Sequence, residues 1–241
     1  MKNIALHIRA ILFYLGYAVF TLFFSVTGSL LFFLPLSIRG RYLILWNQCV
    51  LLWLRICCNI KVKVIGDLPV GAFVAASKHQ SQWETFFLQY HLWPVHVVLK
   101  KELLNIPFFG WALRMVEPIA IDRTQIKSAL SRIQIMGSQC IQNDRRVLIF
   151  PEGTRVKAGS KNRYARSAAD LAIRAQCSLV PIAHNAAYCW PPGQFVKYPG
   201  TITVSFGDPI PANNLSSREL ISRVETWIED ECQRIGDHKD A

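Results

Sequence analysis

The residues of this sequence best suited to acid–base chemistry are His79 and Glu84, which lie five positions apart in the stretch Ser77-Lys-His-Gln-Ser-Gln-Trp-Glu-Thr-Phe86. A histidine titrates near neutral pH and can take a proton from a hydroxyl group. A carboxylate beside it can fix the tautomer of the imidazole and stabilise the imidazolium that forms. The two side chains can meet if His79 lies in a loop and Glu84 in the first turn of the helix that follows.

The same pair also has a purely structural interpretation. A glutamate in the first turn of a helix interacts favourably with the positive end of the helix dipole. His79 would then be an ordinary surface histidine, and short patterns of titratable residues are common in proteins. The choice between the two interpretations therefore depends on the other polar clusters of the chain.

A second cluster lies in Phe150-Pro-Glu-Gly-Thr-Arg155, which ends an apolar run. Gly153 lets backbone N–H groups approach a ligand closely. Arg155 can grip two phosphate oxygens with its guanidinium group, and Thr154 adds a hydroxyl. The segment from Glu152 to Arg155 is therefore a candidate substrate-binding turn. Its alternative is a solvated turn at the end of a strand.

Lys100 and Lys101 form a third cluster, directly after the apolar run Val95–Leu99. Alone, they would be a solvated strand end. All three clusters follow expected strands, and the carboxyl ends of parallel strands lie at the same edge of a sheet, where chemistry usually occurs. A parallel sheet would thus bring the histidine, the lysines and the arginine together.

Short apolar runs alternate with longer amphipathic runs from Lys61 onward, a pattern typical of an α/β domain with a mostly parallel central sheet and helices on both faces. The expected strands are Val62–Ile65, Ala72–Ala76, Val95–Leu99, Pro118–Ile121, Val147–Phe150, Leu179–Ala183 and Thr201–Phe206. The expected helices are Glu84–His91, Phe108–Met115, Thr124–Gln142, Arg163–Ala175 and Ser216–Arg234. The last helix opens on Ser-Ser-x-Glu, which predicts a capping box.

The composition points to anionic lipid rather than nucleic acid as a partner. The chain has 241 residues, with 27 Lys and Arg against 16 Asp and Glu, a net charge of +11, and 51% hydrophobic residues. A basic excess suits anionic partners, and the high apolar content favours a lipid surface. None of the common nucleic-acid-binding signatures is present, so no nucleic-acid partner is expected. Seven scattered cysteines without a CxxC pair predict reduced thiols and no zinc-type metal site.

The N-terminal region predicts a membrane-associated helical hairpin. Ala10 to Ile38 carries no charged residue, and this run would reach about 43 Å as a helix, enough to cross a bilayer with tilt. The next apolar run, Tyr42 to Leu54, would reach only about 20 Å and cannot return across. A hairpin lying in one leaflet, with its flanking arginines at the head groups, resolves this conflict and is favoured over a true span. Two buried helices of a soluble core are a poor alternative, because the runs are rich in Phe and Leu on every side.

Taken in order, the motifs resemble those of the 1-acyl-sn-glycerol-3-phosphate acyltransferases, a family of glycerolipid acyltransferases. They are His79-x4-acid, Lys100-Lys-Glu-Leu-Leu-Asn-Ile-Pro-Phe-Phe-Gly110, Ile121-Asp-Arg123, Phe150-Pro-Glu-Gly-Thr-Arg155 and Val180-Pro-Ile-Ala183. The resemblance covers roughly Val62 to Phe206, and the N-terminal hairpin also resembles that of family members. It divides the chain into a hairpin at residues 1–60 and an acyltransferase domain at residues 61–241.

The resemblance implies transfer of a fatty acyl group from acyl carrier protein or acyl-CoA to the sn-2 hydroxyl of lysophosphatidic acid, giving phosphatidic acid. His79 would be the base and Glu84 would orient it. Lys100, Lys101 and the turn of Glu152, Gly153, Thr154 and Arg155 would bind substrate. No cofactor and no metal is implied. The expected location is the cytoplasmic face of a membrane, such as the bacterial inner membrane.

One departure and two alternatives accompany this interpretation. The family pattern usually has Asp where this chain has Glu84, which adds one methylene and leaves the geometry of the acid open. The acceptor could be another lysolipid, such as a lyso-ornithine lipid, for which charge reversal at Arg155 would matter less. A non-catalytic lipid-binding protein of the membrane surface is the second alternative, and it would not need His79.

Overall fold

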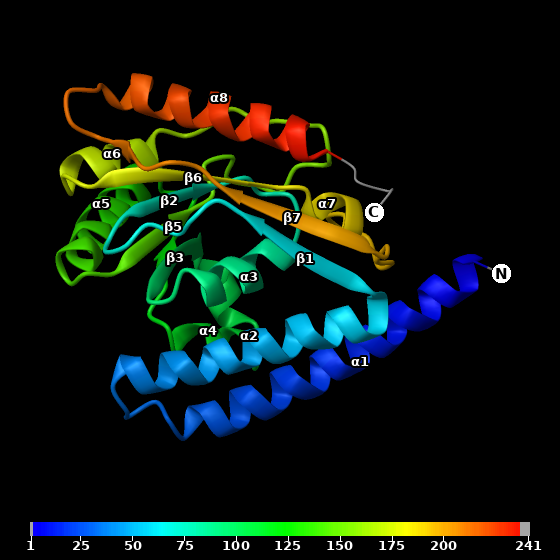
Figure 1. Ribbon diagram of the computed structural model, residues 1–241. Coiled ribbons are helices and arrows are strands. Elements are labelled where there is room, and N and C mark those ends of the chain that lie inside the picture. The colour runs from blue at the N-terminus through cyan, green and yellow to red at the C-terminus, as the bar shows by residue number, and fades with distance from the viewer. Residues whose placement is uncertain (1, 237–241) are drawn as a thin grey trace.

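The computed structural model describes residues 2–236, which form a central sheet with helices on both faces (Figure 1). The strand order is β1-β7-β6-β2-β5-β3-β4, and β8 pairs with β6 beside this path. The strands are β1 (Ile60–Ile65), β2 (Val74–Ser77), β3 (Val95–Lys100), β4 (Ile119–Ile121), β5 (Arg146–Ile149), β6 (Ser178–His184), β7 (Gly200–Phe206) and β8 (Ile210–Pro211). Within these residues five strand pairs are parallel and two are antiparallel, so the predicted mostly parallel α/β fold is confirmed.

The parallel strands β2, β5 and β3 lie side by side and bring their carboxyl ends to one edge. Ala76 of β2 pairs with Ile149 of β5, and Val97 of β3 pairs with Leu148 of β5. The chain therefore leaves all three strands at the same edge, where the three polar clusters follow. The two-residue strand β8 was not predicted, because it contains a proline and is too short to show a pattern.

Helices cover both faces of the sheet. They are α1 (Lys2–Ser29), α2 (Leu36–Cys58), α3 (Trp83–His91), α4 (Phe109–Arg114), α5 (Ile126–Gln142), α6 (Ser167–Arg174), α7 (Ala186–Cys189) and α8 (Ser217–Ile235), with a 3-10 turn at Lys101–Asn105. Ala75 and Leu148 point into the core shared with α1, α2 and α3. Val74 and Val147, one position earlier, point into the core shared with α5, α6 and α8. This alternation is what a strand covered on both faces requires.

The predicted capping box at the start of α8 is present. The Ser216 hydroxyl accepts a hydrogen bond from the backbone N–H of Glu219 at 3.2 Å, and the Glu219 carboxylate accepts one from the backbone N–H of Ser216 at 2.9 Å. These bonds satisfy two N–H groups that the first turn of a helix leaves without a partner. They fix where α8 begins on its face of the sheet.

The N-terminal helices α1 and α2 form the predicted hairpin, which lies along the side of the domain that α3 and α4 occupy (Figure 1). Helix α2 is longer than the apolar run Tyr42–Leu54, because it begins at Leu36 and continues through Arg39 and Arg41. Gly40 permits this, since a Cβ atom there would lie 1.9 Å from the Trp93 ring. The absence of a side chain lets the start of α2 pack directly on the domain.

One face of the hairpin is buried in the domain and the other is exposed. Phe13, Leu43 and Trp46 belong to the same buried core as the sheet residues Ala75 and Leu148. The exposed face carries apolar side chains, which include Ile8, Leu12, Leu15, Val19, Phe23, Leu30, Phe33, Leu45, Leu52 and Ile56. Within α1, Asn3–Ser29 is long and apolar enough to cross a membrane, and 22% of its most apolar window is buried. The division at residue 60 stays a prediction, and the two parts share one core.

Candidate active site

The side chains of His79 and Glu84 meet, as the spacing predicts. His79 lies in the loop after β2, and Glu84 lies in the first turn of α3. The distance from His79 Nδ1 to Glu84 Oε1 is 2.8 Å. The same carboxylate oxygen accepts hydrogen bonds from the backbone N–H groups of Gln80 at 3.0 Å and Ser81 at 2.9 Å. The glutamate thus shapes the loop as well as the imidazole, and with Nδ1 bonded to it the lone pair of Nε2 is available to accept a proton.

Glu84 is fully buried and ionised. Burial alone raises the pKa of its carboxyl, but the hydrogen bonds from the His79 ring and from the N–H of Ser81 help to lower it, and the net pKa lies below its usual value. His79 is not closed off in the same way, because 12% of its side chain is exposed. A buried carboxylate behind a partly exposed imidazole is the arrangement that lets a histidine act as a base.

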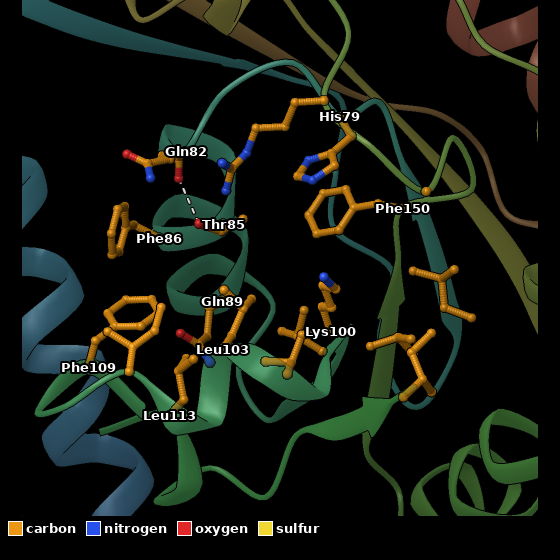
Figure 2. A pocket seen from close by; sticks show the side chains of 18 of the residues that line it. His79, Gln82, Thr85, Phe86, Gln89, Lys100, Leu103, Phe109, Leu113 and Phe150 are labelled. Carbon is orange, nitrogen blue, oxygen red and sulfur yellow. Dashed lines mark hydrogen bonds between the residues drawn. The ribbon is translucent and has the colours of Figure 1, made fainter. Parts of the chain in front are cut away.

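The turn at residues 150–155 holds His79 from the other side. The ring of Phe150 stacks on the imidazole, with centroids 4.2 Å apart and planes 23° apart (Figure 2). The backbone N–H of His79 donates to Glu152 Oε2 at 2.9 Å, and its carbonyl accepts from the N–H of Val156 at 2.9 Å. Both the ring and the main chain of the histidine are therefore fixed by β5 and the turn that follows it.

Glu152 belongs to a buried network behind the histidine. Its Oε1 accepts from Lys78 Nζ at 2.9 Å, and Lys78 Nζ also donates to Glu229 Oε1 of α8 at 2.7 Å. The hydroxyl of Tyr164 donates to the same Glu229 oxygen at 2.8 Å. Burial alone lowers the pKa of Lys78, but its bonds to the two glutamates raise it by more, so the pKa lies above its usual value and the lysine is charged. Both carboxylate oxygens of Glu152 accept hydrogen bonds from the protein itself. This arrangement favours a role in holding the His79 backbone over a role in binding substrate.

His184, at the end of β6, supports the same loop. The residue is completely buried. Its Nε2 donates to the carbonyl of Lys78 at 2.8 Å, and its Nδ1 accepts from the N–H of Ala186 at 3.3 Å. Burial lowers the pKa of His184, which keeps the ring neutral, as this pair of bonds requires. The sequence alone gave little reason to assign Lys78, Phe150 or His184 a role.

A cavity of about 790 Å³ opens beside His79. Its walls are mostly apolar and come from α1, α2, α3, α4, α5 and β3; residues lining it include Tyr17, Trp46, Phe86, Leu103, Phe109, Leu113 and Ile133. Figure 2 shows the Lys100 side chain pointing into this space toward His79 and Phe150. The cavity therefore joins a candidate base to a long apolar space.

The other predicted binding residues divide into two groups. Lys100, Gly153 and Arg155 line the cavity together with His79. Lys101 and Thr154 are exposed and lie outside its lining. Arg123, which the sequence showed only as part of a motif, also lines the cavity, and its guanidinium group donates to the carbonyl of Gly153. The contribution of α1 was not predicted, because no local pattern tells which apolar residues of a hairpin face a cavity.

Comparisons with known proteins place this chain in a family. A family model described as Acyltransferase matches residues 59–185. The 1-acyl-sn-glycerol-3-phosphate acyltransferase of Pseudomonas aeruginosa is 42% identical over 238 residues, which cover 95% of this chain and 91% of that protein. The human 1-acyl-sn-glycerol-3-phosphate acyltransferase alpha is 30% identical over 181 residues, or 72% of this chain and 63% of that protein.

The fold agrees with a solved structure, the 1-acyl-sn-glycerophosphate (LPA) acyltransferase PlsC from Thermotoga maritima. The TM-score is 0.81 over 98% of both chains, with 19% sequence identity. The chain belongs to the 1-acyl-sn-glycerol-3-phosphate acyltransferase family, within the acyltransferases, and is an enzyme. The resemblance seen in the sequence motifs is thereby confirmed.

Proposed function

We propose that this enzyme transfers a fatty acyl group from an acyl thioester to the sn-2 hydroxyl of 1-acyl-sn-glycerol 3-phosphate, giving phosphatidic acid. The names of its relatives support this acceptor. The observation that carries the proposal is the His79–Glu84 pair at an apolar cavity that Lys100 and Arg155 also line. A substrate with an acyl chain, a free hydroxyl and a phosphate has one group for each part of this site.

In the proposed reaction, His79 Nε2 removes the proton of the sn-2 hydroxyl as its oxygen attacks the thioester carbonyl. The new ester C–O bond forms, the C–S bond breaks, and the thiol leaves with a proton returned by the imidazolium. Glu84 keeps the ring in the required tautomer and stabilises its positive charge. The transfer is direct, so none of the seven cysteines is needed as a nucleophile.

The phosphate of the acceptor is assigned to Arg155 and Lys100, with the exposed Lys101, after β3, and Thr154, after β5, as further donors. A guanidinium group can bind two phosphate oxygens at once, and an ammonium group adds a point charge. The open backbone of Gly153 suits close approach, since nothing lies within 4 Å of where its Cβ would be. Holding the phosphate fixes the distance between the hydroxyl and His79.

The apolar part of the cavity is assigned to an acyl chain. Each buried methylene contributes about 0.8 kcal/mol, so a chain of ordinary length is held strongly without any polar contact. The exposed apolar face of the hairpin lies in one leaflet of the membrane, on the cytoplasmic face, and brings the cavity to the lipid substrate. The donor is acyl carrier protein or acyl-CoA, both anionic, which agrees with the net charge of +11.

The test is formation of phosphatidic acid from lysophosphatidic acid and an acyl thioester, comparing the wild type with a folded His79→Ala variant. We expect a loss of activity of about 10²- to 10⁴-fold, the usual contribution of a general base. Equal activity of the two proteins would make His79 a bystander and contradict the mechanism. If the wild type is inactive on lysophosphatidic acid but acylates lyso-ornithine lipid, and Arg155→Glu has little effect on that activity, the acceptor is a different lysolipid.

A further inference from the structure

A second cavity, of about 340 Å³, lies at the opposite edge of the sheet from His79. It is formed where the start of α2 meets the amino ends of β3 and β5, and Ser37, Arg41, Trp93, His96 and Arg145 line it. Since β3 and β5 are parallel and the active site follows their carboxyl ends, this pocket is separate from the catalytic cavity. Nothing in the proposed reaction uses it.

The pocket carries two guanidinium groups and no carboxylate in its lining. Arg145 donates one hydrogen bond to His96 Nε2 at 3.3 Å, which leaves its other N–H groups for a ligand. The Nδ1 of His96 donates to the carbonyl of Glu117 at 2.8 Å, and burial lowers the pKa of this histidine, so the ring is neutral. Arg41 is exposed at the mouth. Two cationic groups that face one cavity suit an anion with several oxygens.

Two acidic residues near this pocket, Glu117 and Asp144, are not part of its lining. Glu117 forms an ion pair with Arg39, which does not line the pocket. The carboxylate of Asp144 interacts electrostatically with Arg146 and opposes the lowering of the pKa of that guanidinium group by burial. The carboxylate of Glu117 still acts on His96 in the pocket wall, but among the described residues no carboxylate forms an ion pair with Arg41 or Arg145.

Helix α2 adds a further feature that favours an anion. It begins at Leu36, and no side chain caps its first turn. The N–H groups of Ile38 and Arg39 donate to the carbonyl of Pro35, whereas Leu36 and Ser37 line the pocket at the positive end of the helix. The hydroxyl of Ser37 is a further donor at the same place.

The surroundings of the pocket indicate what kind of anion it takes. The turn between α1 and α2, directly before Leu36, carries the most exposed apolar residues of the hairpin, and Phe33 is 93% exposed. Apolar side chains next to a cationic pocket match the two parts of a phospholipid, whose chains and phosphate lie at neighbouring depths. We propose that this pocket binds the phosphate of an anionic phospholipid head group and so anchors the hairpin turn at the membrane surface.

The experiment measures binding of the full-length enzyme to two kinds of vesicle, phosphatidylcholine alone and phosphatidylcholine with phosphatidylglycerol. Arg41→Gln combined with Arg145→Gln removes the pocket charges. Arg218→Gln combined with Arg223→Gln removes two exposed charges from α8, on the other face of the sheet. We expect the pocket variant to lose about tenfold or more of its preference for anionic vesicles, and the α8 variant to lose little.

A third variant separates a built site from general attraction of charges. Ser37→Trp fills the pocket without changing any charge, and we expect it to lose the anionic preference as well. The proposal fails if Ser37→Trp keeps the wild-type preference, or if the pocket and α8 variants behave alike. It fails also if the wild type shows no anionic preference while inorganic phosphate raises its melting temperature and not that of the pocket variant, because free phosphate would then be the ligand. This proposal rests on the membrane association of the hairpin in the proposed function. Binding to neutral vesicles tests that association separately.

Discussion

At the scale of single residues, Glu84 is the position where this chain departs from the usual aspartate. The extra methylene lets the carboxylate reach His79 from the first turn of α3 and still accept the N–H groups of Gln80 and Ser81. Its second oxygen, Oε2, is buried without a hydrogen-bond partner in the described part of the chain. Because one carboxylate holds both the loop and the His79 ring, a change in either the loop or the carboxylate is expected to move the imidazole.

We therefore expect Glu84→Gln to lower kcat by about 10²- to 10⁴-fold, because a neutral amide neither stabilises the imidazolium nor fixes its tautomer. Glu84→Asp keeps the negative charge but has a side chain shorter by one methylene, so the fall in kcat should be smaller than for Glu84→Gln. Steady-state rates of the three proteins, each checked for folding by circular dichroism, measure this. A Glu84→Gln variant within a few-fold of the wild type would show that the carboxylate only shapes the loop.

The sequence could predict this pair because both members belong to one short segment, within reach of local rules about loops and helix starts. It could not predict Lys78, although that residue is adjacent to His79. The partners of Lys78 are Glu152 and Glu229, which lie 74 and 151 positions away. A lysine beside a candidate base is by default a solvated cation, and only the fold shows that this one is buried.

At the scale of elements, this lysine connects α8 to the catalytic loop. A buried charge that loses one partner is left poorly compensated, which typically costs 3–5 kcal/mol for a fully buried pair. Glu229 is partly accessible, so we expect Glu229→Gln to lower the free energy of unfolding by about 2 kcal/mol. Activity per folded molecule should fall as well, because the backbone of His79 is held through the same network.

The control is Asp230→Asn, the exposed neighbour of Glu229 on the same helix. It removes the same charge outside the network and should change stability by no more than about 0.5 kcal/mol. Denaturant titrations in detergent would compare both variants with the wild type. Equal effects of the two substitutions on the free energy of unfolding would indicate that only the loss of a negative charge on α8 matters, and that the network does not support the loop.

The elements themselves could be predicted closely wherever apolar periodicity and turn residues coincide. Helix α2 is the instructive exception, since the charged residues Arg39 and Arg41 suggested a break between two apolar runs. The helix continues through them because Gly40 packs on Trp93, Arg39 pairs with Glu117 and Arg41 is exposed. A contact between residues 53 positions apart decided the boundary, and no local rule contains it.

At the scale of the whole molecule, Lys197 connects the C-terminal part of the chain to the hairpin. Its side chain is 1% exposed, donates to the hydroxyl of Tyr14 in α1, and lies 4.1 Å from the centroid of the Tyr14 ring and 4.7 Å from that of Trp190. Burial lowers the pKa of Lys197 to about 8. The wild type thus binds fewer protons when folded than when unfolded between pH 8 and 10.5, so its stability rises with pH in this range.

We expect the stability of the wild type relative to Lys197→Met to increase by about 2 kcal/mol between pH 7 and pH 10. The comparison with methionine cancels the titration of the other groups, which both proteins share. Unfolding by denaturant in detergent at the two pH values measures the difference. A relative stability that stays constant or falls with pH would show that the folded protein does not disfavour the charged amine.

The exposed face of the hairpin sets how the whole molecule meets its substrate. Leu15 is 60% exposed on α1 and does not line the catalytic cavity. If this face lies in the membrane, Leu15→Glu replaces a buried apolar side chain by a charge and should weaken vesicle binding about tenfold or more, since a buried leucine contributes roughly 1.5–3 kcal/mol. Turnover of a short-chain, water-soluble acceptor should remain, because the active site is unchanged.

Ile135→Glu is the matched control, since Ile135 is a similarly exposed apolar residue on α5, in the layer on the other face of the sheet. It should leave vesicle binding near the wild-type value. Equal binding of all three proteins would mean that the apolar face of α1 does not enter the bilayer. A loss of turnover on the soluble acceptor in Leu15→Glu would instead show that α1 is needed to form the cavity, in agreement with the core it shares with the sheet.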